Sequence, residues 1–211
     1  MPRKPAAPED LSDKKALALE VIARLKKEYP DAACTLDYDH AWQLLVSVRL
    51  AAQCTDARVN IVVEDLFAKY PSVAALAAAE PEEIEAIVKP CGLGHSKARD
   101  ISACMRMLRD KYDCKVPTTF EELLSLPGVG RKSANLIMGD VFGKPAIVTD
   151  THCIRLCNKI GLVDGIKEPQ KVEMALWKII PPEEGSDLCH RFVMHGRAVC
   201  NARKPECEKC C

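Results

Sequence analysis

A lysine stands directly behind the tightest turn in the sequence. The stretch LPGVGRKSAN, residues 126–135, contains a proline and two glycines, and Lys132 follows with only Arg131 between it and the second glycine. A lysine amine attacks an electrophilic carbon only when it is deprotonated, and partial burial and the positive end of a helix both disfavour the ammonium form. We expect both effects at Lys132, the second residue of the helix that should begin at Arg131. Further along, Asp150 supplies a carboxylate at an expected helix start. The two are candidates for a nucleophile and its carboxylate partner; the plainer alternatives are a solvated lysine and a helix cap.

The glycines of this turn suit a phosphate group. Gly128 and Gly130 permit backbone geometry that a side chain would forbid, and they expose N–H groups at the start of the expected next helix. Those donors and the helix dipole together favour an anion. The pattern disfavours a nucleotide P-loop, because Arg131 separates Gly130 from Lys132, Gly128 is too close, and no strand is expected before the turn. A plain helix–helix turn is the alternative that the two glycines by themselves leave open.

Four of the twelve cysteines crowd the end of the sequence: Cys200, Cys207, Cys210 and Cys211. Most of the others stand singly in apolar helical patterns, where cysteine behaves as a small buried hydrophobe. Three cysteines at intervals such as those of Cys200, Cys207 and Cys210 can hold a zinc ion with a fourth ligand. Unrelated surface thiols are a weaker explanation, because free exposed thiols are readily oxidised.

The elements that must position these residues are helices. Aromatic residues make up only 5% of the chain, and Ala, Leu, Val and Ile are plentiful, a balance that favours helices over sheets. We predict an all-α fold without a convincing strand. Apolar periodicity, capping residues and prolines predict helices at residues 11–28, 41–53, 56–70, 82–88, 96–112, 119–126, 131–141, 151–160 and 172–179.

Charge and hydropathy limit the possible partners. The formal net charge is zero, so bulk electrostatics indicate no partner, but residues 126–159 carry five Lys/Arg against two acids. A neutral protein with one basic face can still bind a polyanion. No apolar run reaches the roughly 18 residues that a membrane span requires. We therefore expect no membrane partner.

Several stretches, in this order, resemble the helix-hairpin-helix DNA glycosylases, and specifically the endonuclease III family. They are LLVSVRLAAQCTDARVN (44–60), GLGHSKARDI (92–101), LPGVGRKSAN (126–135), VTDTHCIRL (148–156) and HGRAVCNARKPECEKC (195–210). The resemblance extends from about residue 25 to residue 210, and the combined pattern is far more specific than the hairpin alone.

The resemblance implies a two-lobed all-α architecture. Residues 34–144 would form a six-helix barrel lobe that contains the helix-hairpin-helix, and residues 1–33 with 145–211 would form a second helical lobe that carries an iron–sulfur cluster loop. Double-stranded DNA with damaged bases or abasic sites would bind between the lobes of a monomer. The protein would act in the cytoplasm at the nucleoid of a prokaryote, or in the nucleus or mitochondrion of a eukaryote.

The resemblance also implies roles for particular residues of these motifs. Lys132 would attack the anomeric carbon of the sugar, and Asp150 would assist its deprotonation and stabilise the developing positive charge. The chemistry would be that of a base excision repair glycosylase for oxidised pyrimidines with apurinic/apyrimidinic (AP) lyase activity. The implied DNA contacts are those of Gln53, Leu93, Gly128, Val129, Gly130, Arg131 and His152. Plainer interpretations are a helix end for Gln53, a core position for Leu93 and a surface histidine for His152.

The terminal cysteines, by the same resemblance, would hold a [4Fe-4S] cluster. Cys200, Cys207 and Cys210 match the first three positions of the family pattern C-x6-C-x2-C-x5-C, and a cubane needs four thiolates. The fourth cysteine would fall beyond Cys211, where the sequence ends. Three explanations are open: a C-terminal tail absent from this sequence, substitution by Cys211, or an incomplete cluster. We favour the absent tail, because adjacent cysteines make awkward ligands of one cubane.

Three alternative functions stay open at this point. Within the same superfamily, the protein could be a glycosylase for another lesion. A non-catalytic helix-hairpin-helix DNA-binding module would keep the hairpin but would need neither Lys132 nor Asp150. A zinc-held structural protein would be colourless and would contain stoichiometric zinc.

Overall fold

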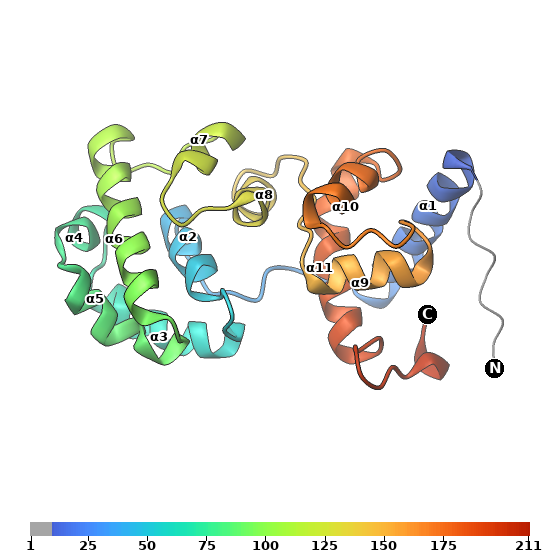
Figure 1. Ribbon diagram of the computed structural model, residues 1–211, viewed down its shortest axis with the longest axis horizontal. Coiled ribbons are helices and arrows are strands. Elements are labelled where there is room, and N and C mark those ends of the chain that lie inside the picture. Colours follow the sequence, from blue (N-terminus) through green and yellow to red (C-terminus); the bar gives the residue numbers. More distant parts are fainter. Residues whose placement is uncertain (1–9) are drawn as a thin grey trace. The chain divides into compact units, whose positions relative to one another are not determined.

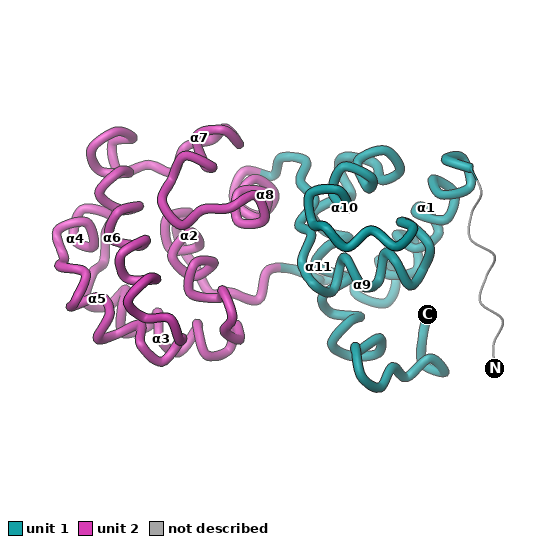
Figure 2. The backbone as a smooth tube through the Cα atoms, in the orientation of Figure 1, with its two compact units in different colours: residues 1–33, 143–211 teal, residues 34–142 magenta. Residues whose placement is uncertain are grey.

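The computed structural model describes residues 10–211, and those residues form helices and loops without a β-strand. The all-α prediction is therefore confirmed (Figure 1). The chain divides into two compact units: unit 1 comprises residues 1–33 and 143–211, and unit 2 comprises residues 34–142 (Figure 2). Within the described residues, no helix is long and apolar enough to cross a bilayer.

Unit 2 is organised around α6 (Gly94–Lys111), which packs against α2, α4 and α5. Its buried apolar side chains form one core, in which the rings of Trp42 and Phe67 meet edge to face with centroids 5.1 Å apart. The hairpin helices α7 and α8 pack against each other, and α8 also packs on α2. The remaining elements of unit 2 are α2 (Ala41–Leu50), α3 (Asp56–Lys69), α4 (Val73–Ala78), α5 (Pro81–Val88), η1 (Lys89–Cys91), α7 (Phe120–Ser125) and α8 (Arg131–Asp140).

Capping residues set several helix starts in unit 2, as the sequence predicts. The Thr55 side chain accepts the Arg58 backbone N–H at the start of α3. The Thr119 side chain accepts the Glu122 backbone N–H at the start of α7. Each bond satisfies one of the N–H groups that a helix start leaves without a partner.

Two helix boundaries in unit 2 differ from the prediction. Helix α2 ends at Leu50 rather than near Gln53, because Gln53 adopts a left-handed conformation (φ 58°) that cannot continue a helix. Helix α6 begins at Gly94 with Leu93 as its N-cap, whereas the sequence suggested Ser96. Ser96 already lies within the first turn, where its hydroxyl donates to the Leu93 carbonyl.

Unit 1 is organised around α11 (Gly185–Ala198), which packs against α1, α9 and η2. The sequence analysis did not predict α11 or α4. The start of α11 carries no capping side chain, and Gly185 stands there because a Cβ would lie 2.5 Å from the Ala146 carbonyl oxygen. The other elements of unit 1 are α1 (Leu11–Glu28), α9 (Thr151–Ile160), α10 (Pro169–Leu176), η2 (Pro182–Glu184) and η3 (Cys207–Lys209).

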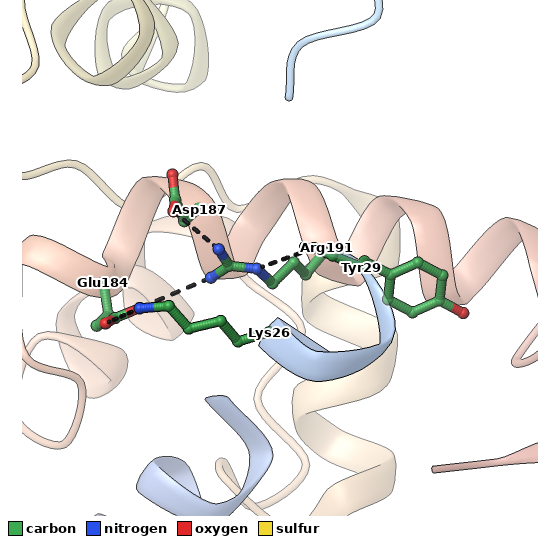
Figure 3. Close-up of polar contacts among 5 residues, drawn as sticks. All are labelled: Lys26, Tyr29, Glu184, Asp187 and Arg191. Atoms are coloured by element: carbon green, nitrogen blue, oxygen red, sulfur yellow. Dashed lines mark hydrogen bonds and ion pairs between the residues drawn. The ribbon is translucent and has the colours of Figure 1, made fainter. Parts of the chain in front are cut away.

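A buried arginine joins α1 to α11 (Figure 3). The Arg191 side chain is only 3% exposed, and it pairs with Asp187 at 2.9 Å and Glu184 at 3.6 Å. Its Nε donates to the carbonyl of Tyr29, which follows α1. Lys26 of α1 pairs with Glu184 at 3.0 Å and completes the network. The Arg191 guanidinium therefore pairs with two carboxylates and also binds the carbonyl of Tyr29, the C-cap of α1.

We predict that Arg191→Met lowers the free energy of unfolding by roughly 3 kcal/mol, because it removes a buried cation that pairs with the partly buried Glu184 and binds the Tyr29 carbonyl. Lys26→Met is the matched control: it removes a cation from the same network, but the Lys26 side chain is more than half exposed, so the loss is below about 1 kcal/mol. Urea denaturation of both variants tests this. Equal losses would show that burial of Arg191 is unimportant.

Candidate active site

The LPGVG stretch forms a type II turn between α7 and α8. The Val129 backbone N–H donates to the Leu126 carbonyl at 3.1 Å, and Pro127 and Gly128 occupy the central positions. Gly128 has φ 76°, the left-handed value that the third residue of a type II turn requires. The proline and the glycine thus have separate roles, and both fix the path of the backbone into α8.

The turn lies on an ion pair between two core helices. Arg49 of α2 donates to Asp100 of α6 at 2.7 Å. A Cβ on Gly128 would lie 2.9 Å from the Asp100 Cβ and 3.1 Å from the Arg49 Cδ. Gly128 is therefore needed for close approach as well as for its backbone angle. The sequence analysis missed this role; its one signal was Arg49, an isolated charge in an otherwise apolar helix.

The second glycine faces open space. A Cβ on Gly130 would meet nothing within 4 Å, and Gly130 is the N-cap of α8 with extended backbone. Because Gly130 has no side chain, it cannot cap the first N–H groups of α8 itself. Those donors, at the positive end of a ten-residue helix, suit a phosphate. Beside them, the Arg131 guanidinium lies 5.0 Å from the ring centroid of Phe120 on α7.

Lys132 occupies the first turn of α8 and is exposed. The partial burial that we expected for it is wrong, because the second position of α8 points away from the core residues Ala134 and Ile137. Lys132 stands two residues after Gly130, so the backbone donors of the turn and the amine belong to one short segment.

Asp150 belongs to unit 1, whereas Lys132 belongs to unit 2. Asp150 is the N-cap of α9, and its Oδ1 accepts the Cys153 backbone N–H at 2.7 Å. The capping role that we considered for it is therefore real. It occupies one carboxylate oxygen, and within residues 10–211 the second oxygen accepts no hydrogen bond. Capping and chemistry at Asp150 are thus compatible.

Gln53 and Leu93 share an unusual geometry within unit 2. Both adopt left-handed backbone conformations, with φ 58° and 50°, although neither is glycine. Both side chains are exposed, and that of Leu93 is 57% exposed, which excludes the core position that we considered for it. Strained residues of this kind persist only where the surroundings hold them.

His152 lies on α9 in close contact with α11. A Cβ on Gly196 would lie 2.3 Å from the His152 Nδ1, so the glycine makes room for the imidazole. Arg155 contacts the same His152 nitrogen at 3.3 Å and donates to the carbonyls of Gly196 and Cys200. His152 is thus partly buried and packed, rather than the freely solvated surface histidine of the plainer interpretation.

The terminal cysteines gather in unit 1 after α11. The Cys210 Sγ lies 3.6 Å from the His195 Nε2, and the opposite nitrogen of His195 contacts the Tyr29 hydroxyl at 3.1 Å. Burial raises the pKa of the Cys210 thiol, and the charges of Cys211, Cys200 and Cys207 raise it further.

Cys200, Cys207 and Cys210 fit an iron–sulfur cluster in the kind of their donors, because thiolates are the ligands of a cubane, which needs four of them. The thiols are not gathered into a coordination sphere: among residues 10–211, no three Cys, His, Asp or Glu side chains lie close enough to hold a metal ion. Binding of a cluster would therefore have to draw the loop from Cys200 to Cys210 together.

Comparison with known proteins identifies the family. The model of the HhH-GPD superfamily base excision DNA repair protein matches residues 46–182. Endonuclease III of Synechocystis sp. is 44% identical over 201 residues, which cover 95% of this chain and 91% of the relative. The chain belongs to the endonuclease III family.

Two solved structures of endonuclease III resemble the present chain over nearly its whole length. One is a non-covalent endonuclease III–DNA complex, and the other is a trapped endonuclease III–DNA covalent intermediate with an estranged adenine. Each is 41% identical, gives a TM-score of 0.88 and matches 93% of this chain and 92% of its own. The fold is thus that of endonuclease III, and the protein is a base excision repair DNA glycosylase and AP lyase.

We predict that alanine at the two hairpin glycines affects different properties, stability at Gly128 and DNA binding at Gly130. Gly128→Ala lowers the free energy of unfolding by roughly 2 to 4 kcal/mol, because it adds left-handed strain and a clash with the Arg49–Asp100 pair. Gly130→Ala changes it by about 1 kcal/mol or less, but weakens DNA binding, since its methyl group lies before the N–H donors. Denaturation and fluorescence anisotropy measure the two effects. A stable Gly128→Ala would contradict the packing argument.

Proposed function

We propose that this endonuclease III homologue removes oxidised pyrimidines from double-stranded DNA as a monomer and then cleaves the strand. The observation that carries the proposal is the segment from Gly128 to Lys132. It joins a rigid turn, an open helix N-terminus and an exposed amine within five residues. The turn would hold a backbone phosphate without reading sequence, as an enzyme that searches for damage requires.

Lys132 is the proposed nucleophile. Its Nζ attacks C1′ of the damaged nucleotide, the glycosidic bond breaks, and the base leaves with a proton. The C1′–O4′ bond then breaks as Nζ loses a second proton and O4′ gains one, which opens the sugar ring and forms an imine. The imine acidifies the 2′ hydrogens of the sugar. Loss of one 2′ proton then breaks the C3′–O3′ bond by β-elimination, and water releases the lysine. The trapped covalent complex of a 41% identical relative supports this course for the present chain.

Asp150 is the proposed carboxylate partner. It would take the proton that Lys132 loses and would stabilise the positive charge that develops on the sugar, because glycosidic cleavage passes through an oxocarbenium-like state. The structural support is its second carboxylate oxygen, which the helix cap leaves available within the described residues.

Gln53, Leu93 and His152 are the proposed contacts with the disturbed duplex. An enzyme that acts on a base inside a duplex must extrude the nucleotide and fill the gap that it leaves. Exposed side chains on strained backbone, as at Gln53 and Leu93, suit this task better than ordinary surface residues. His152 would contact the DNA from α9, held by its packing on Gly196.

Cys200, Cys207 and Cys210 are the proposed cluster ligands, with Cys211 as the fourth thiol that this chain offers. A bound cluster would cross-link the loop between them. The loop carries Arg203 and Lys204, which could then meet DNA phosphates in a fixed geometry. The Cys210 thiol contacts His195, and the His195 ring in turn contacts Tyr29, so α1 and α11 support this end of the loop.

Borohydride trapping on a duplex that contains an oxidised pyrimidine tests the nucleophile. We expect a covalent adduct with the unmodified protein and none with Lys132→Ala. Lys144→Ala is a control that removes another exposed lysine while leaving Lys132 in place. An adduct only with duplexes carrying other lesions would change the substrate assignment. A folded protein that binds DNA but forms no adduct with any damaged or abasic duplex would instead be a binding module or a base-only glycosylase.

The Asp150→Asn variant separates capping from chemistry. Asparagine caps a helix about as well as aspartate, so α9 and the stability of unit 1 should be retained. We expect single-turnover cleavage to fall by at least a hundredfold, while DNA affinity changes by less than about threefold. Thermal unfolding and anisotropy accompany the rate measurement. Equal losses of rate and affinity would make Asp150 a cap without a catalytic role.

The cluster assignment predicts brown protein with four irons per chain after anaerobic reconstitution with iron and sulfide. Cys207→Ser should lose the absorbance and the iron, whereas Cys114→Ser, a change of an exposed cysteine in unit 2, should keep both. Absorbance and metal analysis are independent of enzyme activity. A colourless protein that takes up one zinc ion would contradict the assignment and favour a zinc site.

A further inference from the structure

Lys97 is a fully buried cation in unit 2, with 0% of its surface exposed. Its Nζ donates to two backbone carbonyls, those of Leu50 and Cys91, each at 2.8 Å. Burial lowers the pKa of Lys97, and the nearby thiols of Cys91 and Cys54 oppose that effect. Within residues 10–211 its ammonium contacts carbonyls rather than a carboxylate, an expensive arrangement for a charge removed from water.

Both carbonyls stand at the ends of helices. Leu50 is the last residue of α2, and Cys91 is the last residue of η1. The final carbonyls of a helix lack partners within it and carry partial negative charge. A single ammonium group therefore binds two helix ends that are 41 positions apart in the sequence (91 minus 50).

Each of these helix ends leads directly into one of the four exposed, non-glycine residues of unit 2 with left-handed backbone, the other two being Asp113 and Cys114. Gln53 follows Leu50 by three positions, and Leu93 follows Cys91 by two. Lys97 is also joined to Leu93 through the backbone, because its N–H donates to the Leu93 carbonyl at 3.1 Å in the first turn of α6. Left-handed backbone at a residue with a side chain costs roughly 1 to 2 kcal/mol, so the two loops would relax if nothing held them.

We propose that Lys97 is a positioning residue. Its ammonium holds the loops of Gln53 and Leu93 at a fixed spacing, so that both side chains enter the duplex together when a damaged nucleotide is extruded. The inference rests on the proposed function, in which these two side chains fill the gap. Two side chains from separate loops can enter one gap together only if the loops move as one body. The Lys97 ammonium is the shared contact beneath both loops.

Arg106 provides a matched control on the same helix. It also donates from α6 to backbone carbonyls, those of Ala77 and Ala79 at the end of α4. That contact supports a helix end that carries neither Gln53 nor Leu93. Lys97→Met and Arg106→Met thus each remove cation-to-carbonyl bonds made from α6, although the Arg106 side chain is 42% exposed and also pairs with Glu80.

The experiment is a double-mutant cycle with single-turnover cleavage of a duplex that contains an oxidised pyrimidine. In the otherwise unchanged protein, Lys97→Met should lower the rate at least tenfold, and Arg106→Met less than twofold. In a Gln53→Ala/Leu93→Ala background, Lys97→Met should lower the rate less than twofold further, because the residues through which it acts are gone. Equal fold losses in both backgrounds would make Lys97 merely structural and overturn the proposal.

A second variant keeps the test decisive if Lys97→Met does not fold. Lys97→Arg retains the charge and donors, but its planar fork holds the two carbonyls at a different spacing. It should give a smaller rate loss that again vanishes in the Gln53→Ala/Leu93→Ala background; a loss that persists there would overturn the proposal. Hydrogen exchange should quicken at residues 51–54 and 91–95 and not across the rest of unit 2.

Failure of this inference is distinguishable from failure of the proposed function. If the Lys132 adduct forms but Gln53→Ala/Leu93→Ala cleaves at the unchanged rate, the glycosylase assignment stands and the positioning role is overturned. If no adduct forms with any damaged or abasic duplex, the catalytic assignment itself fails. If Gln53→Ala/Leu93→Ala cleaves slowly and the Lys97→Met effect is non-additive with it, the results support both the proposed function and the positioning role of Lys97.

Discussion

The ion pair between Arg49 and Asp100 ties α2 to α6 and forms the surface on which the hairpin turn rests. Gly128 fits there only because it has no side chain, and its position fixes where α8 begins. The backbone of Lys132 is therefore placed by a contact between two other helices. Partly exposed ion pairs contribute little stability by themselves, so the role of this pair is to orient the turn.

Cations that bind helix-end carbonyls recur in both units. Lys97 and Arg106 do so from α6, Arg155 donates to the Gly196 carbonyl in the last turn of α11 at 3.3 Å, and Arg191 donates to the Tyr29 carbonyl. An all-helical chain with short elements has many helix ends, and each end leaves carbonyls that need partners. Long cationic side chains supply these partners across the core, and they fix loop positions that apolar packing alone would leave adjustable.

The sequence predicts what local chemistry determines. The cap of α7 by Thr119 and the turn at Gly128 follow from residues a few positions apart, and the structure contains both. The end of α2 at Leu50 was predicted wrongly, because the Lys97 ammonium that binds it lies 47 positions away in sequence. Helix α11 was missed because its start has no capping side chain. The exposure of Lys132 likewise depends on how α8 packs, which no local pattern reveals.

In the proposed positioning role, the support that Lys97 gives the Gln53 and Leu93 loops serves base extrusion more than it serves folding stability. Unstacking a nucleotide costs a few kcal/mol, and the side chains that replace it must already be in place when the stack opens. In the proposed role, Gln53 and Leu93 supply that contact only while their backbones keep a conformation that neither residue prefers. A loose loop would relax to ordinary angles and withdraw the side chain. The proposal thus gives a physical reason for a buried charge at Lys97 that is costly for folding.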